Sequence, residues 1–448
     1  MDGAVIDGGL EPARSVTGQV AASSLPEGPL KVGVLVDLML SPDAGGHVKC
    51  WERIAEAAVE FADRLDLTVH FNGPDRSSGP ERIELSPSVR YLLMPPVFST
   101  RRLVRRVPDH TDLGFWHPRL ARMLPNYDVI HTTDAFFCYA RTATRFARRH
   151  GVPVVSSIHT NTPEYARITV EHMLCSAFGG GIGYRLASQS LEIPNLISRL
   201  LKRRLRRHLD QVTVAMASHG GGFDEKFGAW HCGVALRRGL DRALFTPERR
   251  DRSWFETRFG LPRSQFVVMY AGKLNPGKNA CLLGPAIAAA RQSGLPIHLF
   301  CAGAGELRDS LMAQLGGAVT LPGVLAQDEL ARAYASADLF AFPSMIDESG
   351  NAPVEAMAAG LPALLAVGSG VAARLRDCPA ARVLPGDAPL AWAEAIVALA
   401  GAPQRCRELG ALARDHIAST VPTWREVLGD DLLPVWQEAA AVRWSGKP

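Results

Sequence analysis

The sequence predicts an α/β protein built from two doubly wound domains, each on a mostly parallel sheet. Short apolar runs alternate with helical patterns through both halves of the chain, which is the order of elements that parallel sheets require. The 448 residues are enough for two such domains, whereas one domain of this length would be unusually large. We expect a mobile tail at residues 1–29, two domains at 30–234 and 235–420, and a final helix within 421–448.

Composition narrows the class of protein. An apolar content of 47% with 21% charged residues is typical of a soluble globular chain. No run approaches the roughly 18 uninterrupted apolar residues that predict a membrane span. The first 29 residues lack the positive start and apolar core of a secretory signal, so we expect a cytoplasmic protein.

The cysteines are scattered along the chain and include no C-x-x-C pair. We therefore expect buried free thiols, and neither a structural zinc site nor a disulfide framework. The eight positions are Cys50, Cys138, Cys175, Cys232, Cys281, Cys301, Cys378 and Cys406.

Positive charge is concentrated in the first half of the chain. Residues 30–214 hold 25 Lys and Arg against 18 Asp and Glu, whereas residues 235–420 hold 19 against 17. No helix-turn-helix, zinc or RNP-type pattern accompanies this charge, so we expect no nucleic-acid partner.

The first domain begins with a strand at residues 30–36, a loop at 41–46 and an apolar-periodic helix at 48–65. In the loop, Gly45 and Gly46 let the backbone approach a ligand and point amides at it, although a plain turn has the same composition. Further strands are expected at residues 67–71, 89–93, 128–131 and 153–158.

Two histidines lie at the ends of neighbouring predicted strands, facing the edge where ligands of such sheets bind. A histidine at a strand end is more often a hydrogen-bonded structural residue than a catalyst, and we assign that structural role to His131. His159 is a candidate functional residue, because Glu164 and Tyr165 follow it in the same loop.

Residues 167–197 have no clean period and contain a glycine run, and we interpret them as a candidate acceptor-side insertion. The segment from Asn195 to His208 predicts a basic amphipathic helix, with leucines on one face and arginines around the other. Such a helix binds anionic lipid headgroups, but a domain helix whose leucines face the core has the same spacing. Both interpretations stay open.

The second domain repeats the alternation of strands and helices. Strands are expected at residues 266–271, 297–302, 339–342, 363–366 and 382–384. Helices are expected at residues 281–291, 307–315, 328–335, 389–399 and 405–418, and a last apolar helical stripe follows at 423–443. Gly303 and Gly305 form a G-x-G after one strand, which alone is a weak signal for nucleotide binding.

The most informative stretch is residues 339–362, which predicts a buried strand, a polar loop and a short helix that Asn351 and Pro353 open. The amides at the start of this predicted helix, near Gly350 and Asn351, attract a phosphate. The flanking acids are wrong for a phosphate alone, but a carboxylate accepts two hydroxyl hydrogen bonds, as in a sugar nucleotide. These acids are Asp347, Glu348 and Glu355, and Ser349 lies in the same loop.

A second loop of the same domain carries two lysines. Gly272 follows the strand at 266–271, Lys273 comes directly after it, and Lys278 lies in the same loop. Two cations at the carboxyl end of a strand can hold a diphosphate, and they lie in the same predicted sheet as the acids. A lone surface lysine would be solvated and idle, so the pairing of the two loops is the informative feature.

Residues 339–362 resemble the donor-binding motif of retaining GT-B glycosyltransferases of family 4, in which two acids are separated by seven residues. Asp347 and Glu355 have this spacing, although the family usually has Glu at the first position, and Glu348 is next to it. Lys273 and Lys278 match the cations of that family, and Gly45 and Gly46 match its glycine-rich loop. The resemblance covers about residues 30–436.

This resemblance implies a GT-B fold, with two Rossmann-like domains facing across a cleft and a last helix that crosses back to the first domain. It implies transfer of a sugar from a nucleotide sugar, UDP-linked in preference to GDP-linked, to an acceptor hydroxyl with the anomeric configuration kept. It also implies catalysis without a metal or other cofactor, by Lys273, Lys278, Asp347 and His159. Glu355 would bind the ribose.

Two other functions fit the same sequence. A GT-B-like epimerase of nucleotide sugars would share the sheets and the donor site, and a non-catalytic protein would bind the donor without converting it. For the acceptor, the basic helix suggests a membrane lipid, with peripheral contact at the inner face of the cell membrane. A surface polysaccharide or a lipid-linked oligosaccharide is the alternative.

Overall fold

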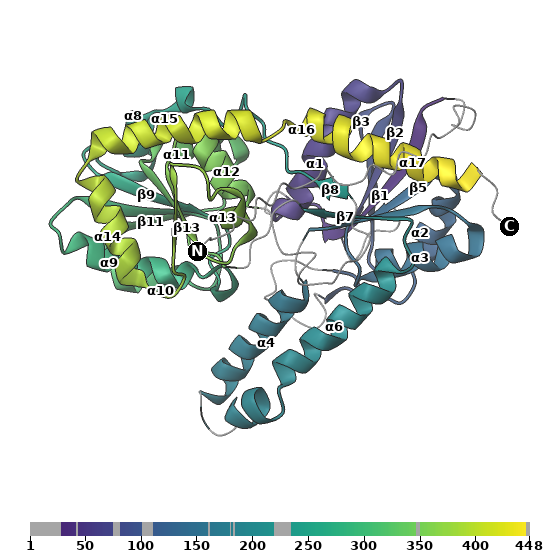
Figure 1. Cartoon of the computed structure of the whole chain (residues 1–448), viewed down its shortest axis with the longest axis horizontal. Coiled ribbons are helices and arrows are strands. Elements are labelled where there is room, and N and C mark those ends of the chain that lie inside the picture. The colour runs from purple at the N-terminus through teal and green to yellow at the C-terminus, as the bar shows by residue number, and fades with distance from the viewer. Residues whose placement is uncertain are drawn as a thin grey trace, which may run out of the picture.

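The computed structural model describes residues 28–41, 44–74, 81–100, 111–159, 162–179, 181, 184–218, 234–345 and 350–444. Figure 1 shows two α/β halves side by side, each with helices packed on a central sheet, and a helical hairpin that projects from the first half. Most of the expected tail, residues 1–29, lies outside the described residues.

The first half is built on eight described strands: β1 (Leu30–Met39), β2 (Leu65–Asn72), β3 (Glu81–Ser86), β4 (Val89–Met94), β5 (Val129–Thr132), β6 (Val154–Ile158), β7 (Val214–Ser218) and β8 (Val234–Leu236). Their order is β3-β4-β2-β1-β5-β6-β7-β8, and the described strands are parallel except for the edge strand β3. The order reverses between β1 and β5. Ligands of such sheets bind at this reversal, outside the carboxyl ends of the strands.

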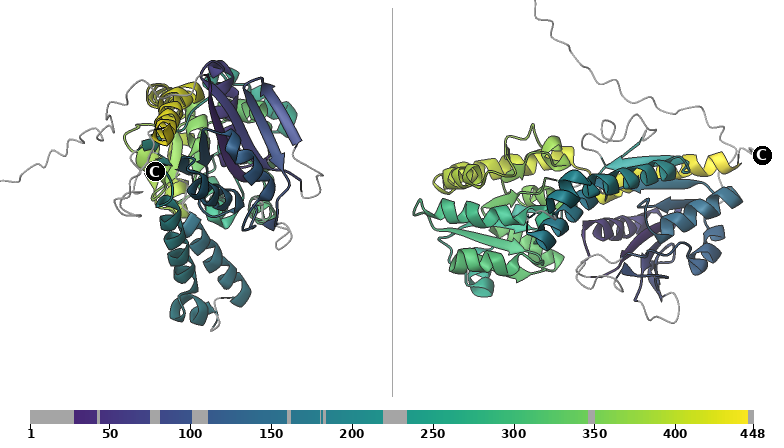
Figure 2. Two further views of the ribbon diagram at one scale, coloured as in Figure 1. Left: turned by 90° about the vertical axis from the view of Figure 1, so that its right-hand side faces the viewer. Right: turned by 90° about the horizontal axis from the view of Figure 1, so that it is seen from below.

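The helices of this half include α1 (Gly46–Ala58), α2 (Pro118–Met123), α3 (Cys138–His150), α4 (Thr162–Phe178) and α6 (Ile193–Leu209). The helix expected at residues 48–65 is shorter than predicted, because Leu65 already pairs with Leu30 as the first residue of β2. The segment expected to be an insertion forms α4 and a π-helical turn at Arg185–Ser190, and α4 packs along α6 to make the hairpin of Figures 1 and 2.

The second half is built on six described strands: β9 (Phe266–Ala271), β10 (Ile297–Ala302), β11 (Val319–Gly323), β12 (Leu339–Phe342), β13 (Ala363–Ala366) and β14 (Ala381–Leu384). Their order is β11-β10-β9-β12-β13-β14, with parallel pairing between the described neighbours. This order reverses between β9 and β12, so the loops that follow these two strands lie at the ligand-binding edge.

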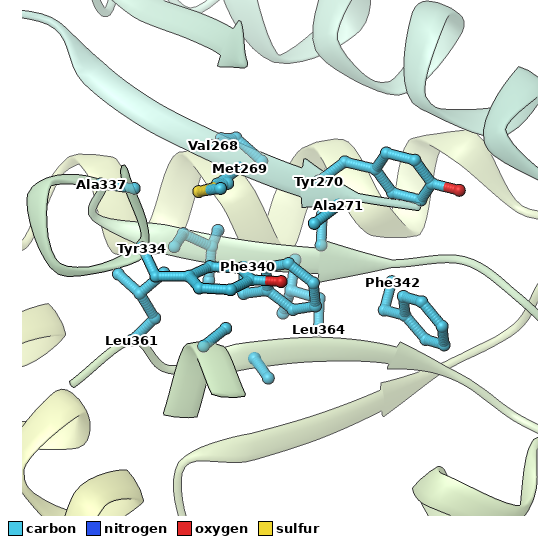
Figure 3. Packing of buried hydrophobic residues seen from close by; sticks show 14 of the residues in the cluster. Val268, Met269, Tyr270, Ala271, Tyr334, Ala337, Phe340, Phe342, Leu361 and Leu364 are labelled. Carbon is cyan, nitrogen blue, oxygen red and sulfur yellow. The ribbon is translucent and has the colours of Figure 1, made fainter. Parts of the chain in front are cut away.

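Helices cover both faces of this second sheet: α8 (Arg252–Phe259), α9 (Leu283–Arg291), α10 (Arg308–Leu315), α11 (Gln327–Ser336), α12 (Asn351–Ala358), α13 (Gly370–Arg374), α14 (Pro389–Ala400) and α15 (Pro403–Thr420). Figure 3 shows the core beneath them, where the rings of Tyr334 and Phe340 pack edge to face with their centroids 5.7 Å apart.

The end of the chain returns to the first half. After α16 (Trp424–Glu426) and a π-helical turn at Val427–Leu432, α17 (Leu433–Trp444) lies over the first sheet in Figure 1. Trp436 is fully buried in the core that also contains Val32 and Val69, whereas the core of the second half draws on residues 240–421. An ion pair between Arg237 and Asp431 links the π-helical turn before α17 to the segment that joins the two halves.

Two further sequence predictions concern the thiols and the membrane. Cys175 and Cys281 are exposed, which corrects the expectation that the thiols are buried; the other described cysteines are buried, and all of them are free. Among the helices that the structure describes, none has both the length and the apolar character needed to cross a membrane.

Candidate functional site

The lysine loop, residues 272–279, follows β9 and is fastened to the end of β12. The side chain of Asn275 accepts a hydrogen bond from the backbone N–H of Lys278 at 2.9 Å. Asn279 has a positive φ of 53°, and its side-chain nitrogen donates to the carbonyls of Pro343 at 3.1 Å and Gly386 at 2.7 Å. Lys278 therefore lies where the strand order of the second sheet reverses.

The backbone around Gly303 and Gly305 packs directly against the lysine loop. The amides of Gly272 and Leu274 donate to the carbonyls of Ala302 and Ala304 at 3.0 and 2.9 Å. A Cβ on Gly303 would stand 1.9 Å from the carbonyl oxygen of Gly272, and one on Gly305 would stand 2.2 Å from that of Leu274. The G-x-G pattern thus permits a close approach of two backbones, a role that the sequence reasoning missed.

We expect Gly303→Ala to displace the lysine loop, because the new Cβ meets rigid backbone and the φ of 150° strains a side chain. The variant should lose about 2–4 kcal/mol of stability, the sum of overpacking and backbone strain. Turnover should fall even at temperatures where the variant is folded. Thermal unfolding and steady-state rates check both effects.

Gly294→Ala is the matched control for this prediction. Gly294 also has a positive φ, 80°, but a Cβ added there would have no atom of the described residues within 4 Å. The variant should therefore lose only the backbone contribution, about 1 kcal/mol, and keep its turnover. Equal turnover in both variants would show that Gly303 does not position the lysines.

The acid stretch is described only in part. Asp347, Glu348 and Ser349 lie outside the described residues, so their predicted contacts with a sugar stay predictions. Gly350 has a φ of 59° and caps α12, and a Cβ there would overlap Val371. The side-chain oxygen of Asn351 is buried without a hydrogen-bond partner in the described part of the chain.

Glu355 lies in the second turn of α12, in a small pocket between the halves. The hydroxyl of Tyr334 donates to its carboxylate at 3.5 Å. Burial raises the pKa of Glu355 to about 7, and the nearby positive charge of Arg53 opposes this shift. Lys49 and Arg53 of α1 and Asn351 also line the pocket. Sequence reasoning found the glutamate but missed its partners from α1.

The glycine loop of the first half reaches the start of α12. Gly45 caps α1 in an extended conformation, and a Cβ on Gly46 would stand 3.5 Å from the side-chain nitrogen of Asn351. On the other side of the site, a Cβ on Gly277 of the lysine loop would stand 3.3 Å from the ring of Tyr165 of α4. The ligand-binding edges of the two sheets therefore face each other.

His159 is buried, and both of its ring nitrogens have protein partners. Arg238 donates to Nδ1 at 2.8 Å, so Nε2 carries the proton and donates to the hydroxyl oxygen of Ser157 at 2.7 Å. His47 stacks on the ring with centroids 4.4 Å apart. Burial, helped by His47 and Arg238, holds the pKa of His159 well below its ordinary value. The ring is neutral, and this geometry favours positioning over proton transfer.

His131 has the structural role that we expect for it. The indole N–H of Trp436 donates to Nδ1 of His131 at 2.9 Å, and Nε2 of His131 lies 2.8 Å from the hydroxyl oxygen of Ser157. A hydrogen-bonded chain therefore runs from the last helix through His131 and Ser157 to His159. Arg238 and His47 complete this cluster. The sequence reasoning missed them because Arg238 lies 79 residues beyond His159 and His47 lies in the first turn of α1.

Trp436→Phe should keep the packing of α17 but leave Nδ1 of His131 without its donor. We expect a loss of about 1–3 kcal/mol of stability, because a buried acceptor goes unsatisfied. If the hydrogen bonds from Trp436 through His131 and Ser157 position His159, kcat should also fall severalfold with little change in donor KM. Trp392→Phe is the control, since its N–H donates to the carbonyl of Pro385 in the second half. A comparable stability loss with unchanged kcat in both variants would show that these hydrogen bonds have only a structural role.

Two doubly wound α/β halves whose ligand-binding edges meet define the GT-B class of protein. Residues 45–229 match the glycosyl transferase 4-like domain, and residues 265–402 match the model described as glycosyl transferases group 1. The chain belongs to the family 4-like glycosyltransferases, which confirms the predicted family and fold.

Curated relatives agree with this family assignment, and solved structures share the fold. The chain is 28% identical to the D-inositol 3-phosphate glycosyltransferase of Stackebrandtia nassauensis over 95% of each chain. It is 26% identical to that of Salinispora arenicola, with 89% of this chain and 88% of the relative covered. Sucrose-phosphate synthase from Thermosynechococcus elongatus has the same fold, with a TM-score of 0.66 and 16% identity over 92% of this chain and all of that one. Anabaena HepE in complex with UDP-glucose has a TM-score of 0.60 and 16% identity over 93% and 99%.

Proposed function

We propose that the protein transfers a sugar from a UDP-sugar to a hydroxyl group of its acceptor with retention of the anomeric configuration. The observation that carries this proposal is the attachment of the lysine loop to the end of β12 by Asn279, beside the start of α12. This arrangement supports a site that holds a charged leaving group and a hydroxyl-rich ligand together. Anabaena HepE, a GT-B neighbour, is described in complex with UDP-glucose.

Catalysis in this proposal rests on charge that is in place before the reaction. When the bond between the anomeric carbon and the diphosphate breaks, negative charge develops on UDP and positive charge on the sugar. Lys273, Lys278 and the amides at the start of α12 would stabilise the leaving group. Such preorganised groups typically contribute several kcal/mol. Because these groups would carry the leaving-group charge, we propose a reaction without a metal.

The acceptor hydroxyl attacks from the face that the diphosphate leaves. A bond forms between the acceptor oxygen and the anomeric carbon, the bond to the diphosphate breaks, and the departing phosphate takes the hydroxyl proton. Asp347, assisted by Glu348, would hold sugar hydroxyls, and Glu355 would accept hydrogen bonds from the ribose. His159, a neutral imidazole whose two ring nitrogens already have protein partners, would act indirectly by positioning the groups around it.

For the acceptor we propose a membrane lipid or a glycan, used in the cytoplasm at the inner face of the membrane. A second candidate is a phosphorylated cyclitol, which the names of the relatives favour: they are D-inositol 3-phosphate glycosyltransferases that match this chain over most of its length. A membrane-lipid acceptor is held in a bilayer, whereas a phosphorylated cyclitol is not.

A donor screen followed by an acceptor assay tests the proposal. A UDP-sugar should raise the thermal unfolding temperature in a concentration-dependent manner, because it binds only the folded state. Turnover should then require an acceptor, and NMR of the product should show the donor's anomeric configuration. An altered donor sugar formed without acceptor would favour an epimerase. Donor binding with no conversion by inositol phosphate, lipid or glycan acceptors would favour a non-catalytic protein.

A further inference from the structure

The far end of the helical hairpin projects from the molecule and has no role in the proposed transfer reaction. Figures 1 and 2 show α4 and α6 extending side by side away from both sheets. The 17 residues of α6 correspond to about 25 Å of helix, so the tip stands well clear of the body. The hairpin stays attached at its root, where Arg204 donates to the carbonyl of Phe136.

Large apolar side chains gather toward the tip of this hairpin. Six of them are each at least 49% exposed: Met173, Phe178, Leu186, Leu191, Leu196 and Leu200. Leu205, nearer the root, is instead buried against Phe136. The apolar face predicted from Asn195 to His208 therefore divides into a root half that packs on the domain and a distal half that does not. Exposed large apolar side chains concentrated on one projecting element are typical of an interaction site.

The charge of the hairpin is strongly positive. Residues 162–209 contain eight Lys and Arg against three Asp and Glu. Each of these acids already has an arginine partner within the hairpin: Arg167 pairs with Glu164 and Glu171, and Arg199 pairs with Glu192. On α6, Arg203 and Arg207 continue the exposed stripe of Leu196 and Leu200, because these positions recur at helical spacing. The surface therefore has an apolar end bordered by cations.

We propose that the hairpin docks on an anionic lipid surface, with its apolar tip in the headgroup boundary and the arginines of α6 against the headgroups. Anionic membranes bind surfaces of this kind, because apolar side chains insert at the headgroup boundary and cations attract the anionic headgroups. A second copy of the chain is a poorer occupant, because it would bring two positive hairpins together. A projecting tip also suits insertion between lipids better than a fit into a protein groove. The proposal does not depend on the donor chemistry.

Vesicle flotation of the full-length protein, without donor or acceptor, tests this surface. The protein should float with vesicles of equimolar phosphatidylcholine and phosphatidylglycerol, and much less with phosphatidylcholine alone. Phe178→Ser with Leu186→Ser and Leu191→Ser should lower the partition roughly tenfold. Arg203→Gln with Arg207→Gln should lower it roughly 25-fold, about fivefold for each charge removed.

Matched variants in the second half control for surface changes of the same kind. Met312→Ser with Leu390→Ser and Leu412→Ser removes three exposed apolar side chains elsewhere, and Arg405→Gln with Arg414→Gln removes two exposed charges. These variants should float like the unaltered protein. Equal flotation of the hairpin variants and the controls would overturn the proposal. So would a hairpin-dependent dimer, seen by sedimentation velocity, that does not bind vesicles.

Cys175, exposed on α4 near the tip, provides an independent readout. An environment-sensitive fluorophore on Cys175, in a Cys232→Ser and Cys281→Ser background, should shift its emission to the blue when anionic vesicles are added. The same fluorophore on Cys281, in a Cys175→Ser and Cys232→Ser background, should not shift. Identical responses at the two sites would contradict insertion of the tip, whether or not the protein transfers a sugar.

Discussion

Lys278→Ala should lower kcat roughly 10²–10³-fold, the usual effect of removing one preorganised group that stabilises developing charge. Donor binding should weaken much less, because the charge on the diphosphate grows as the bond to the sugar breaks. The substitution should leave the loop in place, since Asn275 holds the backbone amide of Lys278 and Asn279 holds the carbonyls of Pro343 and Gly386. Single-turnover rates with saturating donor measure the chemical step directly.

Two further variants sharpen this result. Lys278→Arg keeps the positive charge and should retain a larger share of the rate. Lys31→Ala removes a lysine whose side chain is exposed on β1, and it should have no effect on kcat. If Lys278→Ala binds the donor and transfers the sugar at the unaltered rate, the leaving group is stabilised elsewhere and our assignment of this lysine is wrong.

The central strands were predictable because they are buried on both faces. Residues 339–342 form one short apolar run, and β12 has these bounds in the structure. The edge strands of the two sheets could not be predicted in the same way. β3 alternates charged and apolar residues at an exposed edge, and β11 contains Pro322 and Gly323, which argue against a strand by local rules.

The candidate site also has a part that could be predicted from local sequence and a part that could not. Local sequence indicates which loops follow β9 and β12, so both loops could be assigned to one edge of one sheet. The support of Gly272 by Gly303, and the bond from Arg238 to His159, join residues far apart in the chain, and no local pattern encodes such contacts. The hairpin was obscured by the glycine run that interrupts its period, although the amphipathic pattern of α6 was visible.

Glu355→Gln should stabilise the protein at alkaline pH. Burial raises the pKa of Glu355 from 4.5 to about 7, so the folded state holds its proton more tightly than the unfolded chain does. The stability gained from this proton is fully present below pH 4.5 and is lost as the pH rises to about 7. Above that pH the buried carboxylate costs up to about 3 kcal/mol relative to a neutral side chain. Glutamine removes the cost, so the unfolding temperature of the variant should exceed that of the unaltered protein at pH 8 and approach it at pH 5.

The same substitution should weaken donor binding, in the opposite direction to its effect on stability. In the proposed site the carboxylate would accept hydrogen bonds from two ribose hydroxyl groups, whereas the amide has one oxygen acceptor and would present N–H groups to the other hydroxyl. We expect donor affinity at pH 8 to fall roughly 10–100-fold, because a buried hydrogen bond to a charged group is lost. In the unaltered protein, affinity should rise as the pH increases through about 7, and this dependence should disappear in the variant.

Measurements of unfolding temperature and donor affinity between pH 5 and 8 separate this role from simple packing. Glu394→Gln, which changes an exposed glutamate on α14, is the control and should alter neither quantity. A Glu355→Gln variant that is less stable at pH 8 would show that the carboxylate is satisfied by protein groups in the free enzyme. A variant that is more stable but binds the donor normally would remove Glu355 from the ribose site. The combination of higher stability with weaker binding is expected only if the fold keeps an unfavourable buried charge for its ligand.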